Sequence, residues 1–174
     1  MRIAYIAALS VLGNNVQAAD EGWREYVYPE SAFAAEYPLR PKIDIRDYRT
    51  AQVPAGAVTE RVYSVNSGGV TYEVDVADFS KTAAEKDRTI EEAAKAMLAQ
   101  GKMTHDESGA RVDFNYGREI RVEDGMGGSI TNAIFFIDKK LYQLKVTFPS
   151  GNTDPAGSSG IHFFQQTFRL LNGY

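Results

Sequence analysis

The stretch SITNAIFFIDKKLYQLKVTF, residues 129–148, is the part of the chain that determines the fold class. It holds two strongly apolar segments, 129–137 and 141–148, separated by three polar residues. In the second segment apolar residues alternate with polar ones, which is the pattern of a β-strand with one covered face. Two such segments joined by a short polar turn predict a β-hairpin. We therefore expect an antiparallel sheet that is covered on one face.

Similar alternation predicts further strands on the N-terminal side of this hairpin. The expected strands are 33–37, 42–48, 60–65, 70–79, 111–116 and 118–123. Residues 66–69, Asn-Ser-Gly-Gly, favour a hairpin between the third and fourth of these. In the fifth strand we expect Val112, Phe114 and Tyr116 to face inward.

Thr89 and Glu92 have the spacing of a capping box, with the Thr as the residue before the first helical turn. Apolar residues follow at helical spacing, and Gly101 ends the pattern. This predicts an amphipathic helix over about residues 89–100.

A second stripe at helical spacing lies near the C-terminus, where Ser158 or Ser159 could cap a helix. The stripe consists of Ile161, Phe164, Phe168 and Leu171. It predicts a C-terminal helix over about residues 159–171. Two helices packed on a mainly antiparallel sheet give an α+β fold.

The first eighteen residues have the anatomy of a cleavable secretory signal. Arg2 supplies a positive charge, residues 3–12 are apolar except for one serine, and Val16 and Ala18 occupy the two positions that a signal peptidase reads. The apolar run is too short to span a bilayer, which takes about 20 helical residues. We predict a signal peptide over residues 1–18, a single domain over residues 19–174, and a periplasmic or secreted location.

The chain contains no cysteine. An exported lipoprotein needs a cysteine at its cleavage site, so we expect no membrane anchor after cleavage. Disulfides are excluded as well, and the hydrophobic core must stabilise the domain. The net charge is −4, or −5 once the segment carrying Arg2 is removed, and no basic tract is present. Nucleic acid is therefore not an expected partner.

Three segments resemble motifs of a known superfamily. The first is Phe33 to Pro38 followed by Pro41, the second is residues 117–119 together with 134–137 and 141–146, and the third is residues 163–168. Together they resemble the PsbP-like superfamily of small exported proteins, which includes the DcrB-type envelope proteins of bacteria. One difference is His162, which stands where that group has an arginine.

The resemblance implies a PsbP-like α/β/α sandwich. It also implies a non-enzymatic accessory or binding domain that acts through an envelope protein or a small ligand and needs no cofactor. The family is functionally diverse, so the resemblance names no particular ligand or partner.

His105 and Asp106 have the donor types of a metal half-site, and Glu107 follows them directly. We expect all three in a loop after Gly101, where consecutive residues rarely converge on one ion. We also expect no second histidine nearby, because His162 lies in the C-terminal helix as a surface or packing residue. A solvated loop is the alternative interpretation.

Two further pairs are candidates for ligand binding. Glu73 and Asp75 share the polar face of a strand, where a buried carboxyl could serve acid–base chemistry; a solvated sheet face is the alternative. Trp23 and Tyr28 belong to an aromatic cluster that could stack on a sugar or a peptide. Their alternative role is to pack the N-terminal segment against the sheet.

Two function hypotheses follow. The first is an exported, non-enzymatic accessory or binding domain. The second is a hydrolase or metal-assisted enzyme that uses His105 and nearby carboxylates. A concave pocket that holds His105 with two carboxylates favours the enzyme, whereas a filled sandwich with a flat polar sheet face favours the binding domain.

Overall fold

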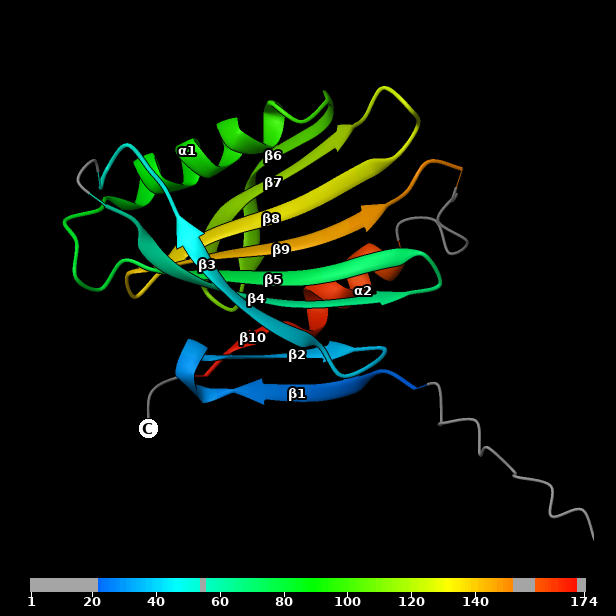
Figure 1. Cartoon of the computed structure of the whole chain (residues 1–174), viewed down its shortest axis with the longest axis horizontal. Coiled ribbons are helices and arrows are strands. Elements are labelled where there is room, and N and C mark those ends of the chain that lie inside the picture. Colours follow the sequence, from blue (N-terminus) through cyan, green and yellow to red (C-terminus); the bar gives the residue numbers. More distant parts are fainter. Residues whose placement is uncertain (1–21, 54–55, 152–158, 172–174) are drawn as a thin grey trace, which may run out of the picture.

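The computed structural model describes residues 22–53, 56–151 and 159–171. Its largest element is a seven-stranded antiparallel sheet in the order β3-β4-β5-β9-β8-β7-β6 (Figure 1). In chain order these strands are β3 (Lys42–Tyr48), β4 (Val58–Ser67), β5 (Val70–Asp78), β6 (Lys102–Val112), β7 (Asn115–Glu123), β8 (Ser129–Ile137) and β9 (Lys140–Phe148). A smaller antiparallel sheet, in the order β1-β2-β10, consists of β1 (Arg24–Tyr28), β2 (Phe33–Tyr37) and β10 (Arg169–Leu170).

The two α-helices lie on opposite faces of the large sheet (Figure 1). Helix α1 (Lys86–Leu98) packs across β7 and β8 on one face. Helix α2 (Ser159–Thr167) and the small sheet lie on the other, and a short 3-10 helix, η1 (Pro29–Ser31), joins β1 to β2. The α+β class with a mainly antiparallel sheet is therefore confirmed. No helix within residues 22–53, 56–151 and 159–171 is both long enough and apolar enough to cross a membrane.

The predicted hairpin around residues 129–148 is confirmed, with a tighter turn than expected. Ile137 pairs with Lys140, which leaves Asp138 and Lys139 as a two-residue turn. Both turn residues have positive φ, 48° and 61°. Such a turn matches the right-handed twist of the flanking strands, and it sets the register of the two central strands of the sheet.

Each face of the large sheet carries its own hydrophobic core. Under α1, Ala93, Ala94 and Met97 pack against residues of the sheet such as Ile134 and Leu141. The core on the other face joins the sheet to α2 and to the small sheet. Its members include Tyr37, Val74, Leu144, Phe164 and Phe168. The expectation of one covered face is therefore wrong. The face under α1 is buried as well, both at apolar residues such as Ile134 and at polar ones such as Asn132 and Gln143.

Both helices differ from their predicted limits. Helix α1 begins one turn before Thr89, and the Thr89 hydroxyl donates to the Glu85 carbonyl at 2.6 Å. Thr89 is therefore a buried position of the first turn and does not cap the helix. Helix α2 ends at Thr167, and Arg169 and Leu170 then pair with β2. Leu171 donates its N–H to the carbonyl of Ala32, just before β2. Phe168 is buried as expected, but it lies just after the helix.

The segment around Phe114 also differs from the prediction. The positive φ of Asp113, 50°, turns the chain between β6 and β7, so residues 111–116 are not one strand. Phe114 is 90% exposed at this turn and Tyr116 is more than half exposed. The proposed cap Ser158 and the proposed signal peptide, residues 1–18, lie outside the described residues.

Candidate functional site

The two faces of β7 differ sharply in chemistry. Ile120 and Val122 are buried on the face that carries α1. Because side chains alternate along a strand, Glu119, Arg121 and Glu123 lie on the opposite face. The polar face of β7 therefore points to the side of the sheet where α2 lies.

Strand β6 adds an imidazole and a carboxylate to this face. His105 pairs with Arg121 and Glu107 pairs with Glu119 in the register of β6 and β7. The predicted loop around His105 is thus an edge strand. Six of the first seven residues of that strand are polar and all seven are exposed, so hydrophobic periodicity gave no signal for it.

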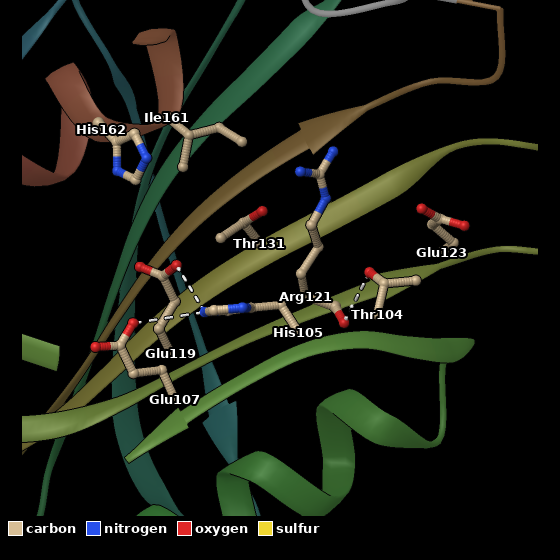
Figure 2. Close-up of a pocket in the computed structure, with 9 residues that line it drawn as sticks. All are labelled: Thr104, His105, Glu107, Glu119, Arg121, Glu123, Thr131, Ile161 and His162. Carbon is tan, nitrogen blue, oxygen red and sulfur yellow. Dashed lines mark hydrogen bonds and ion pairs between the residues drawn. The ribbon is translucent and has the colours of Figure 1, made fainter. Parts of the chain in front are cut away.

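A cavity of about 400 Å³ lies above these side chains, and α2 forms its opposite wall with Ile161 and His162 (Figure 2). The two histidines of the chain therefore line one cavity, and the expectation that no second histidine lies near His105 is wrong. The proximity of the two histidines could not be predicted from their spacing in the sequence, because β6 and α2 are far apart along the chain.

Two carboxylates approach the same nitrogen of His105. Its Nε2 lies 3.6 Å from Glu107 Oε2 and 3.8 Å from Glu119 Oε1 (Figure 2). These distances exceed those of hydrogen bonds, so the contacts become ion pairs only when the imidazole carries a proton. Glu119 is mostly buried, whereas His105 and Glu107 are largely exposed. The imidazole is thus accessible from the cavity.

The floor of the cavity contains polar atoms that the protein leaves unbonded. Thr131 is 2% exposed, and its hydroxyl has no hydrogen-bond partner within the described residues. Nε of Arg121 also has no hydrogen-bond partner within the described residues, although Nη2 of the same side chain donates to the Ser129 hydroxyl at 3.3 Å. A buried hydroxyl or N–H without a partner costs roughly 1–3 kcal/mol, so these atoms favour a ligand or water in the cavity.

A second, smaller cavity of about 190 Å³ continues the first and shares Glu107, Glu119 and His162 with it. Its floor is apolar, formed by Ala133, Phe135 and Leu144. Gln165 of α2 lines it as well, and Nε2 of this residue has no partner in the described part of the chain. We refer to the two adjoining cavities, bounded by α2 and the β6–β7 hairpin, as the α2–β7 groove.

Asp106 does not join His105 at this groove. It lies on the α1 face, where Arg118 donates to its two carboxylate oxygens at 2.9 and 2.8 Å. This pairing holds the pKa of Asp106 below its usual value. Across residues 22–53, 56–151 and 159–171, no three His, Cys, Asp or Glu side chains are arranged to hold a metal ion.

Glu73 and Asp75 also lie on the α1 face, away from the groove. They do not form a solvated sheet face, because Asp75 is fully buried. Its carboxylate accepts hydrogen bonds from Lys145 and, at 2.8 Å, from Arg46, while Lys145 also bonds Glu73 at 3.3 Å. Burial raises the pKa of Asp75 above its usual value, to about 7. These carboxylates belong to an internal ion-pair cluster.

The aromatic candidates near the N-terminus contact other aromatic rings. Trp23 makes edge contacts with Tyr72 and Phe163 at centroid distances of 4.9 and 5.1 Å. Tyr28 is buried and packs on Tyr63 at 4.3 Å. In the structure both residues attach β1 to the rest of the domain.

No protein-family model and no curated protein matches the chain.

Proposed function

We propose that the protein is an exported, non-enzymatic binding domain of the cell envelope and that its ligand occupies the α2–β7 groove. The observation that carries the proposal is the buried Thr131 hydroxyl, which lies in the floor of the groove without a partner among the described residues. Binding sites are concave, with a few placed polar groups that a ligand satisfies. The groove is concave, and eight of the nine residues that line its larger cavity are polar or charged.

The arrangement at His105 supports binding over general-base catalysis. In a base-and-orienter pair, the carboxylate contacts one imidazole nitrogen and leaves the other free to take the proton. Here both carboxylates approach Nε2, at 3.6 and 3.8 Å. Both distances exceed that of a hydrogen bond, so neither carboxylate holds the ring in the orientation that a general base needs.

We also propose that the fold is a PsbP-like sandwich. In support, the segments that carry the resemblance contact one another in the domain. Phe33 stacks on Phe168 at 5.4 Å and Tyr37 packs on Phe164 at 5.2 Å. The helices lie on opposite faces of the large sheet, as three layers require.

Affinity capture from the envelope extract of the native host tests the binding proposal. The wild-type mature protein is compared with Glu107→Lys, which reverses an exposed charge in the groove, and with Glu85→Lys, which reverses an exposed charge next to α1. We expect the captured molecule to be lost with the first variant and kept with the second. Equal capture by all three proteins would contradict a ligand site in the groove.

A hydrolase or metal-assisted enzyme is the second candidate. It is favoured by one observation, namely that a pocket holds His105 together with two carboxylates, Glu107 and Glu119. If the protein is a binding domain, His105→Ala should change the free energy of unfolding by no more than about 0.5 kcal/mol. Stoichiometric zinc or calcium in the purified protein, lost in His105→Ala together with several degrees of melting temperature, would favour the metal-assisted enzyme.

A further inference from the structure

We propose that the α2–β7 groove binds an extended peptide segment that places a lysine or arginine side chain beside Glu107 and Glu119. This inference rests on the proposed binding function and names the class of partner. Three features of the groove carry it: its length, its charge, and the spacing of its unpartnered polar atoms.

The length of the groove fits a peptide. Its lining residues run from Glu123 at one end of β7 to Val112 of β6, which pairs with Asn115 at the other end of β7. At about 3.3 Å per residue, this run of strand spans roughly 26 Å. A bound segment in extended conformation would place about eight residues along it.

The charge of the groove selects a cation. The larger cavity is lined by the carboxylates of Glu107, Glu119 and Glu123 and by one guanidinium, that of Arg121. With both imidazoles neutral, these four groups leave the larger cavity with a charge of −2, and Arg111 of the smaller cavity brings the whole groove to −1. Helix α2, which forms the opposite wall, has no acidic residue in its first turn and no basic residue in its last turn. It therefore does not offset the negative charge of the cavity. A lysine or arginine side chain of the partner would supply the missing positive charge.

The unpartnered atoms distinguish a peptide from a small amine. Nε of Arg121 and Nε2 of Gln165 are buried donors without an acceptor in the described segments, and the Thr131 hydroxyl can also donate. An ammonium ion has only donors and leaves these groups unpaired. A peptide offers a carbonyl acceptor at each residue together with a cationic side chain, so it satisfies both kinds of group in the groove.

The apolar floor of the smaller cavity adds a second element of specificity. Ala133 and Leu144 line it at the level of Glu119, and Phe135 lies further along, in the direction of Val112. Arg111 at this end has its guanidinium 5.1 Å from the centre of the Tyr116 ring. An apolar side chain of the partner, a few residues from its basic one, would pack against this floor and so remove its own apolar surface from water.

Selection from an unbiased library of eight-residue peptides tests the inference. The baits are wild type, the double variant Glu107→Gln/Glu119→Gln and the control Glu85→Gln. Wild type and control should enrich peptides with one Lys or Arg and a nearby apolar residue. The double variant should lose that enrichment. The best peptide is then synthesised with both ends blocked, and its affinity is measured beside a Lys→Glu version and n-butylamine.

We expect the Lys→Glu peptide to bind at least tenfold more weakly and n-butylamine to show no competition at peptide-saturating concentrations. Enrichment of uncharged or acidic peptides that still depends on the groove would overturn the basic specificity and keep the binding function. Competition by n-butylamine at the affinity of the peptide would show a small-amine site. No enrichment over the double variant would overturn the peptide class, and the envelope capture described above then decides whether the groove binds anything.

Discussion

Gly117 lies in β7 at a point where its backbone comes close to Ile134 and Phe135 of β8. A Cβ atom at this position would collide with the Ile134 carbonyl oxygen and would lie 2.5 Å from Cδ1 of Phe135. Backbone of a central strand cannot move aside cheaply, so the collision must be relieved by separating the two strands. Any side chain at this position would therefore force β7 and β8 apart.

We predict that Gly117→Ala lowers the free energy of unfolding by about 2 kcal/mol, the usual cost of overpacking a well-packed site. Urea unfolding measures it. Gly125→Ala is the control, because a Cβ atom there meets nothing within 4 Å. Equal stability of the two variants would show that β7 and β8 are not packed as closely as described.

Phe168 is the residue at which α2 gives way to β10. Its ring stacks on Phe33 at 5.4 Å and packs on Tyr142 at 5.7 Å, so it joins the small sheet to the large one. We expect Phe168→Ala to cost about 3–5 kcal/mol of unfolding free energy, as for other buried phenylalanines. Thermal melting with Phe114→Ala as the matched control tests this, because Phe114 is 90% exposed. Similar melting temperatures would contradict the burial of Phe168.

At the scale of elements, the ion-pair cluster lies on the α1 face of the sheet, where three of its members line a cavity together with Ala96 and Met97 of α1. Four strands contribute to it: Arg46 from β3, Glu60 from β4, Glu73 and Asp75 from β5, and Lys145 from β9. One oxygen each of Glu60 and Asp75 has no partner within the described chain. Burial of Asp75, with a smaller contribution from the neighbouring carboxylates, raises its pKa to about 7.

This raised pKa predicts a pH dependence of stability. From pH 4 to pH 7 the folded protein holds a proton on Asp75 that the unfolded chain, with an ordinary pKa near 3.8, has released. The contribution of Asp75 to the free energy of unfolding is therefore largest below pH 4, falls as the pH rises to about 7, and is constant above. The lowered pKa of Asp106 acts in the opposite direction, but only below about pH 4.

Urea unfolding of wild type, Asp75→Asn and Asp47→Asn between pH 4 and pH 7 checks this prediction. Asp47 is an exposed neighbour on β3 and controls for the loss of a carboxylate. We expect Asp75→Asn to remove a downward slope that the other two proteins share. Parallel pH curves for all three would show that Asp75 ionises normally in the folded protein.

The strands that the sequence predicted are those with an apolar alternation or a tight turn. The β8–β9 hairpin is one, because its strands are buried in the centre of the sheet. Strand β6 was missed because, as an edge strand with two register irregularities, it exposes most of its residues on both faces. The groove was not predicted for a related reason. Most of its lining residues are polar, and polar residues in an alternating pattern are normally assigned to the solvent-exposed face of a sheet.

For the molecule as a whole, sequence patterns predicted the fold class. They did not predict which residues lie on each face of the large sheet or which helix covers each face. That His105 and α2 line one cavity depends on packing across the sheet, which no local spacing encodes. The alternation of β7 did carry part of the signal, because it placed Glu119, Arg121 and Glu123 on one face. The alternation could not show that α2 leaves a cavity over these three side chains.

The last prediction concerns export. Signal peptidase reads small residues at the two positions supplied by Val16 and Ala18, so the exported protein should begin at Ala19 or Asp20. Cleavage there leaves the whole described domain, beginning with the packed Trp23, intact. Intact mass spectrometry of the periplasmic or secreted protein should show the loss of residues 1–18. Ala18→Arg, which blocks a small-residue position, should keep the protein at full length and attached to the membrane fraction. Full-length wild type in the soluble periplasmic fraction would contradict the signal peptide, and a wholly cytoplasmic protein would contradict export and a role in the cell envelope.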